Sequence, residues 1–568
     1  MTLTRARSPE PPSRGSEGSA PAPVTVGLSR TADGRPVPSA RHRLVPDERR
    51  HNRRTGWLVT VAVTALAGFL RFWNLGRPAD FLFDETYYAK DAWSLLQHGY
   101  PLGFVDDADE QILSGDLQGL FTDSPSMVVH PEAAKWLIAL GEWAFGLDPF
   151  GWRVASAVVG TLAVLVMVRL ALRLTGSVVL GAAAGLLLTF DGLHFVMSRL
   201  ALLDGFLTFF LLAGVACLVA DRDWGRERLA RAVPPGWVAS AADWGPVRGV
   251  RFRPWRLAAG VMLGLAVSTK WSALFPIAAL GLLVWAWDTG ARRSLGVRSA
   301  WLRAGIADGL LAFVHIVVVA FLVYLVSWTG WLVHAEEYEQ SLSDTQYGAY
   351  WGDYLEDDAE GLPREAVQSL RSLWNYHQDV YTFHTRGLVE ADHVYASHPG
   401  GWLVLNRPVG VNADLDIEPG TQGCDAPEDS TCLRQVVLLG TPVLWWGGLL
   451  ALGYSVWGWA ARRDWRFAIP VVGLATTWLP WLRYDDRPIF SFYAVATVPF
   501  TVLAVTLLMG RLLGTARSSY HRRMYGAVVA GTFLVLVVVN FAWFWPVYTD
   551  ELITTPEWLQ RIWFERWI

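Results

Sequence analysis

The apolar residues of this chain lie in long blocks, and this feature constrains the fold more than any other. Each block approaches the roughly 20 residues that a helix needs to cross a bilayer. Inside hydrocarbon, every backbone N–H and C=O must be bonded within its own segment, which favours helices. We therefore predict an all-α polytopic membrane protein with eleven spans, at about 57–75, 153–172, 178–190, 200–220, 257–269, 271–287, 309–331, 436–459, 467–482, 489–513 and 524–545.

Basic residues are sorted between alternate loops, and this sorting predicts the orientation. Lys and Arg are enriched in short cytoplasmic loops. The basic segments are the N-terminal tail, 169–173, 222–256, 292–303, 462–466 and 511–523. We expect these in the cytoplasm, with two large extracytoplasmic loops at about 76–152 and 332–435. An odd span count places the N-terminus in the cytoplasm and the C-terminus outside. The net charge of −4 says little about partners, because the two signs are segregated along the chain.

The two ends of the hydrophobic region suggest a simple domain organisation. Residues 1–54 are rich in Pro, Ser, Gly and Arg without an apolar period, which predicts a disordered cytoplasmic tail. The first apolar run begins only at Trp57, too late for a signal peptide, so residues 55–568 are expected to form one membrane domain.

The chain has three cysteines, two of them in the second outward loop. Cys424 and Cys432 would lie in an oxidising compartment, where we expect a disulfide; two unpaired thiols are the alternative. Cys217 falls within a span.

The unusual polar residues gather on the predicted outer side. They are Asp84 and Glu85 after the first span, His130, Lys135 and Arg153 around the second, Asp191, His194, Ser198 and Arg199 between the third and fourth, Lys270, His334 and Glu336, and the segment 483–488. Ionisable groups near a membrane are costly and mark a substrate or ion path.

Two classes of protein could use such a path, an enzyme and a transporter. A transporter should carry charges near mid-membrane, broken helices and matching halves. Here the mid-span candidates are chiefly Asp204 and His315, and no internal repeat is present. A hydrogen bond between helices is the simpler explanation of Asp204. The pattern therefore favours a membrane enzyme over a transporter or an inactive scaffold.

Seven segments occur along the chain in a characteristic order: "FLFDETYYAKDA", "HPEAAKWLIALG", "WRVASAVVGTL", "SRLALLDGFLTFF", "STKWSALF", "WNYHQDVYTFHT" and "DDRPIFSFYAVATVPF". Together they resemble the protein O-mannosyltransferases, membrane glycosyltransferases of the GT-C class. Glu132 and Ala133 depart from the family's usual His-Pro-Pro stretch. The loop 332–435 is too short for the MIR domain of eukaryotic members. The resemblance therefore implies a bacterial relative in the plasma membrane.

The resemblance implies a polyprenyl phosphomannose donor, a Ser or Thr hydroxyl of an exported protein as acceptor, and inversion at the sugar carbon. One carboxylate suffices as base, because a phosphate leaves as a stable anion without an acid partner. Asp84 is the candidate base, unless it only caps the helix that follows. Its neighbour Glu85 should point elsewhere, to orient the acceptor or to pair with Arg153, which the family pattern marks as important.

The donor phosphate needs fixed cations, for which the candidates are Arg199, Lys270, Arg483 and Arg487. Each could instead anchor a helix end at the lipid head groups. We predict substrate contacts from His130, Lys135, His377 and His384; the last two are seven residues apart and share a helical face.

No metal-ligand set stands out, and we predict catalysis without a metal or other cofactor. Membrane lipid is an expected partner, export machinery is a further candidate, and nucleic acid is not expected. Two alternatives stay open: a GT-C transferase acting on a lipid or polysaccharide, and a transporter of the lipid-linked sugar.

Overall fold

The computed structural model describes residues 29–30, 36–37, 40–45, 53–234, 237–240, 242–246, 252–344, 351–356 and 361–568. Most of the predicted tail, residues 1–54, therefore lies outside the described residues. Within it, β1 (Ser29–Arg30) pairs with β2 (Pro36–Val37), and α1 (Ala40–Leu44) is a helix. Leu44 of α1 is buried with Leu229 and Leu295, so this part of the tail packs against the membrane domain.

Helices coincide with all eleven predicted spans. They are α2 (Arg53–Phe72), α6 (Pro149–Thr175), α7 (Val178–Thr189), α9 (Leu203–Ala232), α10 (Pro254–Val267), α11 (Leu274–Ser294), the helix Ala300–Ser327 (α12, Ala300–Ala304; α13, Leu310–Phe313; α14, Val319–Ser327, joined by two π-turns), α18 (Pro442–Ala460), α19 (Ala468–Trp478), α20 (Val498–Leu513) and α21 (Tyr520–Tyr548). Among the described residues, seven helices are long and apolar enough to cross a membrane. The chain is thus a multi-pass membrane protein, and the count of eleven stays a prediction.

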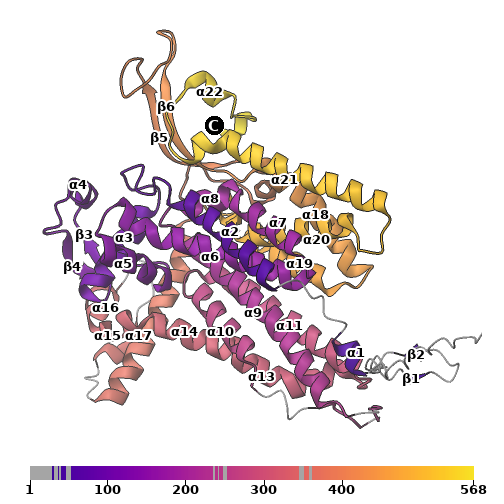
Figure 1. The fold of residues 1–568 in the computed structure, drawn as a ribbon. Coiled ribbons are helices and arrows are strands. Elements are labelled where there is room, and N and C mark those ends of the chain that lie inside the picture. The colour runs from indigo at the N-terminus through magenta and orange to yellow at the C-terminus, as the bar shows by residue number, and fades with distance from the viewer. Residues whose placement is uncertain are drawn as a thin grey trace, which may run out of the picture.

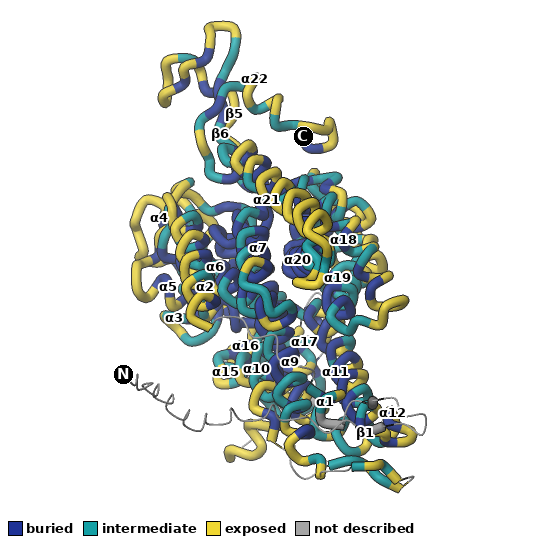
Figure 2. The backbone as a smooth tube through the Cα atoms, turned by 45° about the vertical axis from the view of Figure 1, so that its right-hand side comes forward, coloured by how far each residue is buried: buried dark blue, intermediate teal, exposed yellow. Residues whose placement is uncertain are grey.

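The helices differ in how deeply they lie within the bundle (Figures 1 and 2). α9 and α20 are mostly buried, whereas α21 and Ala300–Ser327 expose large apolar side chains such as Val535, Leu310 and Phe321. In water these side chains would be costly, but a lipid-facing surface requires them. The apolar exterior therefore marks the perimeter of the bundle. The polar residues singled out in the sequence must then lie inside the bundle or at one of its ends.

Short helices and strands cover one end of the bundle. The first predicted outer loop contains α3 (Glu85–His98), α4 (Ala108–Ser114), α5 (Ala133–Phe145), β3 (Leu102–Phe104) and β4 (Phe121–Pro125). α8 (Gly192–Met197) lies between α7 and α9, and α15 (Thr329–Val333), α16 (Ala335–Leu342) and α17 (Leu362–Thr382) follow α14.

The fold is mostly helical, as predicted, but the described residues also form three small antiparallel sheets: β1–β2, β3–β4 and β5–β6–β7. Antiparallel β5 (Val409–Ile417) and β6 (Cys432–Leu438) project together beside α22 (Thr555–Leu559) and the C-terminus, and β7 (Ile553–Thr554) pairs with β6 (Figure 1). The span predicted from residue 436 begins instead at Pro442, because the apolar run 436–438 belongs to β6. The expected disulfide is present and links Cys424, in the loop after β5, to Cys432, the first residue of β6; Cys217 is a free thiol.

Candidate active site

Asp84 lies at the turn between α2 and α3, immediately before the first residue of α3. Its carboxylate makes no capping hydrogen bond to α3; instead, Oδ2 accepts a 3.3 Å hydrogen bond from the hydroxyl of Tyr88. An aspartate whose main task was capping would accept from a backbone N–H of the first turn. The side chain is therefore available for another role.

Asp84 is partly buried, and its surroundings are charged. Burial raises the pKa of Asp84; the nearby charge of Lys270 opposes the rise and that of Asp204 adds to it. Lys270 lies between α10 and the 3₁₀ turn η2 (Trp271–Ala273), and its Nζ is 2.7 Å from Oδ2 of Asp204 at the start of α9. Two carboxylates and one ammonium from three distant parts of the chain thus share one region.

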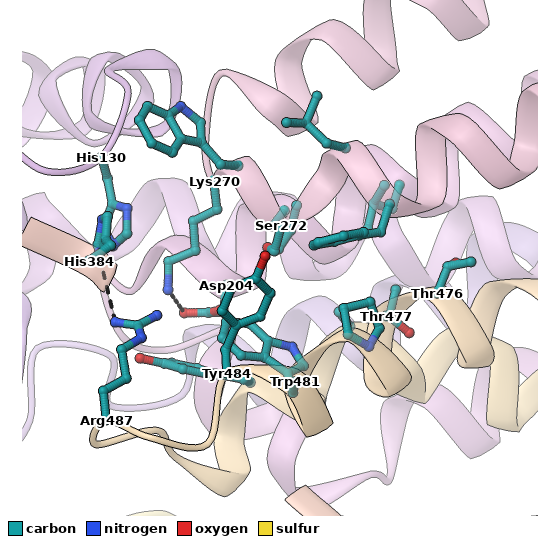
Figure 3. A pocket seen from close by; sticks show the side chains of 18 of the residues that line it. His130, Asp204, Lys270, Ser272, His384, Thr476, Thr477, Trp481, Tyr484 and Arg487 are labelled. Carbon is teal, nitrogen blue, oxygen red and sulfur yellow. Dashed lines mark hydrogen bonds and ion pairs between the residues drawn. The ribbon is translucent and has the colours of Figure 1, made fainter. Parts of the chain in front are cut away.

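The Lys270–Asp204 pair lines a cavity of about 350 Å³ (Figure 3). At one end lie the polar side chains His130, Asp204, Lys270, His384 and Arg487. The remainder is largely apolar and includes Leu207, Leu211, Leu274, Phe275, Pro480, Trp481, Thr476 and Thr477.

The threonine side of this cavity offers few free polar groups. The hydroxyls of Thr476 and Thr477 donate to Val472 and Gly473 carbonyls of α19, at 2.8 and 2.9 Å. Figure 3 shows these threonines opposite the end that holds His130, His384 and Arg487. The cavity therefore suits a molecule with an anionic head and a hydrocarbon tail.

The cavity histidines are neutral at physiological pH. Burial is the main cause that lowers the pKa of His384 to about 4, and burial likewise lowers the pKa of His130 well below its usual value. His384 donates from Nε2 to the Val129 carbonyl at 3.1 Å, and its Nδ1 is 3.5 Å from a guanidinium nitrogen of Arg487. The rings of His130 and His384 stack 5.4 Å apart. The positive charge at this end therefore comes from Lys270 and Arg487.

His377 and Lys135, the two other predicted substrate contacts, touch lining residues from outside the cavity. The Nε2 atom of His377 is 2.5 Å from the Tyr324 hydroxyl, and its ring stacks on Trp271, which lines the cavity. Lys135 forms a 2.9 Å ion pair with Asp91 and donates to the His130 carbonyl at 3.2 Å. Neither His377 nor Lys135 belongs to the lining itself.

Glu85 and Arg153 form the ion pair that the sequence analysis considered. Arg153 Nη2 is 2.7 Å from Glu85 Oε2, and both side chains are fully buried. Glu85 Oε1 also accepts from the Ala201 N–H at 2.8 Å, while Arg153 donates to the carbonyls of Pro78 and Asp80 at 2.7 and 2.8 Å. This pair fastens the turn that carries Asp84 to α6, and neither of its residues lines the cavity.

The structure does not bring Arg199 or Arg483 to the cavity. The Arg199 guanidinium donates to backbone carbonyls at the end of α2, namely those of Leu70, Arg71, Trp73 and Asn74. Arg483 is exposed to solvent and is not part of the lining. Lys270 and Arg487 are the two predicted cations that reach it.

Sequence reasoning assigned Asp204 to a hydrogen bond between helices and did not single out Trp271, Tyr484 or Tyr493 as lining residues. Asp204 had a detectable signal, a carboxylate within an apolar block. The aromatic residues had none, because 31 Trp, 17 Tyr and 26 Phe are spread along the chain. Within the described part of the chain, no three His, Cys, Asp or Glu side chains converge as a metal site would; independence of metal stays a prediction.

Comparison with known proteins supports the resemblance that the sequence segments suggested. Residues 61–231 match the family profile described as dolichyl-phosphate-mannose-protein mannosyltransferase, and residues 369–567 match the C-terminal four TMM region of protein-O-mannosyltransferase. The chain is 37% identical over 533 residues to the polyprenol-phosphate-mannose–protein mannosyltransferase of Mycolicibacterium smegmatis (strain MKD8), covering 92% of this chain and 95% of that protein.

More distant relatives agree with this assignment. The protein of the same name from Corynebacterium glutamicum is 33% identical, covering 90% of this chain and 92% of its own length. The structure of the Saccharomyces cerevisiae protein O-mannosyltransferase Pmt1–Pmt2 complex bound to the sugar donor aligns with a TM-score of 0.65 at 14% identity, covering 92% of this chain and 93% of that one. The predicted GT-C fold is therefore confirmed, and the chain belongs to the protein O-mannosyltransferases, a family of membrane glycosyltransferases.

Proposed function

We propose that the protein transfers mannose from a polyprenyl phosphomannose to Ser or Thr hydroxyls of exported proteins, with inversion at the sugar carbon. One observation carries the proposal: Lys270, whose charge acts on Asp84, opens onto a cavity with a cationic end and an apolar remainder. A lipid-linked sugar phosphate has the matching chemistry, since its phosphate suits Lys270 and Arg487 and its isoprenoid suits the leucine-lined part. The names of the relatives support the same donor and acceptor.

The proposed step is a single displacement at the anomeric carbon. The acceptor hydroxyl oxygen forms a bond to this carbon while Asp84 takes the hydroxyl proton, and the bond from carbon to the phosphate oxygen breaks with its electron pair on that oxygen. Cations fixed in advance stabilise this charge as it develops, which is the role proposed for Lys270 and Arg487. The raised pKa of Asp84 makes it a stronger base than a solvated aspartate.

We place this reaction at the outer face of the bacterial plasma membrane, with the N-terminus cytoplasmic and the C-terminus outside. The sorting of basic loops favours this orientation. The Cys424–Cys432 disulfide favours it too, because such bonds persist in oxidising compartments and β5 and β6 lie beside the C-terminus (Figure 1).

The function is tested with purified full-length protein, a radiolabelled polyprenyl phosphomannose and a peptide rich in Ser, Thr and Pro. We expect label on the peptide hydroxyls. Label that reaches only a lipid or polysaccharide acceptor would overturn the protein acceptor in favour of the related transferase. Movement of donor across vesicles by Asp84→Asn, without transfer by the wild type, would instead indicate a transporter.

Arg487→Met should weaken donor use. Loss of a charge-assisted contact to phosphate costs about 1.5–3 kcal/mol, so we expect the KM for the lipid-linked donor to rise roughly 10–100-fold. Arg483→Met is the matched control, because Arg483 is four residues away, exposed and outside the cavity lining. Equal donor KM values in the two variants would remove Arg487 from the phosphate site.

The pH dependence of turnover should report the environment of Asp84. A base must be ionised to act, and burial raises the pKa of Asp84, so kcat should fall on acidification at a higher pH than for an ordinary aspartate. Since Lys270 opposes this rise, Lys270→Met should move the acid limb to still higher pH in addition to lowering kcat. Profiles of kcat against pH for both proteins measure the shift. An unmoved limb would mean that Asp84 does not sense Lys270.

A further inference from the structure

Phe83, the residue directly before Asp84, has an unusual backbone conformation. Its φ angle is +54°, in the left-handed region. Bulky residues rarely adopt this region, because Cβ approaches the neighbouring carbonyl oxygen. Such a conformation persists only when the surrounding structure holds it in place, and it is common where a functional group must be aimed.

The ring of Phe83 is held by three other rings. Its centroid is 5.4 Å from that of Phe490, 5.6 Å from that of Phe492 and 5.9 Å from that of His393, each in an edge-to-face arrangement. The ring of His393 also packs 4.9 Å from Phe490. Edge-to-face geometry at these distances is favourable beyond simple burial and fixes ring orientation. We call these four residues the aromatic anchor.

The aromatic anchor is continuous with the cationic end of the cavity. Phe490 and Phe492 belong to the short segment 487–493, which begins at Arg487 and ends at Tyr493, both lining residues. The ammonium of Lys270 lies 4.8 Å from the centre of the Tyr493 ring. The first and last residues of this seven-residue segment therefore line the proposed donor site, while Phe490 and Phe492 between them contact Phe83.

Asp84 itself is weakly restrained. The hydrogen bond that its carboxylate accepts from the Tyr88 hydroxyl is long at 3.3 Å, and the carboxylate makes no capping bond. The direction of its carboxylate must therefore depend on the backbone on either side. On the following side, Glu85 is held by its buried ion pair with Arg153. On the preceding side, Phe83 is held by its ring contacts.

We propose that Phe83 is a positioning residue: its left-handed backbone, held by Phe490, Phe492 and His393, aims the Asp84 carboxylate at the acceptor and ties it to the segment that holds the donor phosphate. This inference rests on the proposed transferase function. Loss of the anchor should affect kcat more than donor KM, because the donor contacts stay while the base loses its alignment. Misplacement of a catalytic group by about 1 Å can lower the rate by about 100-fold.

The test compares three substitutions of Phe83 in the full-length protein. Phe83→Leu removes the ring, Phe83→Gly removes the ring while relieving the backbone, and Phe83→Tyr keeps the ring. We expect kcat to fall roughly 10–100-fold in the first two, with donor KM within about 3-fold, and to be largely kept in the third. Full kcat in Phe83→Gly would show that only backbone freedom matters and would overturn the proposal.

Two further variants keep the test independent of folding. Phe490→Leu should reproduce the kcat loss, and the Phe83→Leu/Phe490→Leu double variant should be little worse than either single one, because both remove the same contact. Additive losses would overturn the proposal, whether or not the Phe83→Gly protein accumulates. Phe104→Leu, which disrupts a 4.7 Å ring pair with Phe121 across β3 and β4, is the matched control and should keep wild-type kcat.

The outcomes separate this inference from the proposed function. If the wild type mannosylates the peptide and Asp84→Asn does not, but the Phe83 and Phe490 variants keep full kcat, the positioning role fails while the function stands. If the wild type transfers no mannose to peptide, the function itself fails.

Discussion

Asp84→Asn should lower kcat for transfer to peptide by roughly 10²- to 10⁴-fold, the range that a positioned general base supplies. The substitution keeps the size of the side chain and its ability to accept a hydrogen bond from Tyr88, but an amide cannot take the acceptor proton. Donor binding should persist, because Lys270 and Arg487 are unchanged. Single-turnover transfer from a labelled donor, with donor binding measured separately, distinguishes a loss of mannose transfer from a loss of donor binding.

Asp80→Asn provides the control for Asp84→Asn. Asp80 lies four residues earlier in the same turn, is exposed, and bonds through its carboxylate to the N–H of Phe81. We expect near wild-type kcat from this variant. If Asp84→Asn retained a tenth or more of wild-type kcat, Asp84 could not be the base, and a group such as Asp204 would have to replace it.

The sequence predicted the helices well because a bilayer imposes a length and a composition on every span. It also named His130, Lys270, His384 and Arg487, which line the cavity and lie in segments whose order is recognisable without a structure; Asp84 is not among the lining residues, and its role as base stays a prediction. Charge near an apolar block is rare enough to attract attention, and two of these four, Lys270 and Arg487, lie directly at the ends of predicted spans. The pairing of Glu85 with Arg153 was one of two roles considered for Glu85, and the family resemblance suggested Arg153 as the partner.

Other features depended on tertiary contacts that no local pattern reveals. Arg199 and Arg487 look alike in sequence, yet one satisfies helix-end carbonyls and the other lines the cavity. The strand β6 has an apolar run that merged with the following span, and its partner β5 is interrupted by Asn412, Asp414 and Asp416. Phe83 could not be singled out among 26 phenylalanines, because its backbone conformation appears only in the fold.

The buried pair of Glu85 and Arg153 carries the largest expected effect on stability. Glu85→Gln leaves the Arg153 charge in a region closed to solvent, which should lower the free energy of unfolding by about 3–5 kcal/mol. Arg153→Met should be at least as costly, because the carbonyls of Pro78 and Asp80 also lose their donor. Thermal or denaturant unfolding in detergent measures both. Glu227→Gln is the control: its partner Arg231, one helical turn further on, lies 3.2 Å away, and the two side chains are 46% and 61% exposed, so we expect at most about 1 kcal/mol.

The double variant Glu85→Gln/Arg153→Met separates stability from catalysis. Removing both charges ends the cost of an unpaired buried ion, so the double variant should be more stable than the sum of the single losses predicts. Activity should not recover with it, because the turn before α3 would still lack the bonds that hold Asp84 between Phe83 and α6. Recovery of kcat together with stability would mean that the pair serves only the fold, and that the aim of Asp84 is set by the aromatic anchor alone.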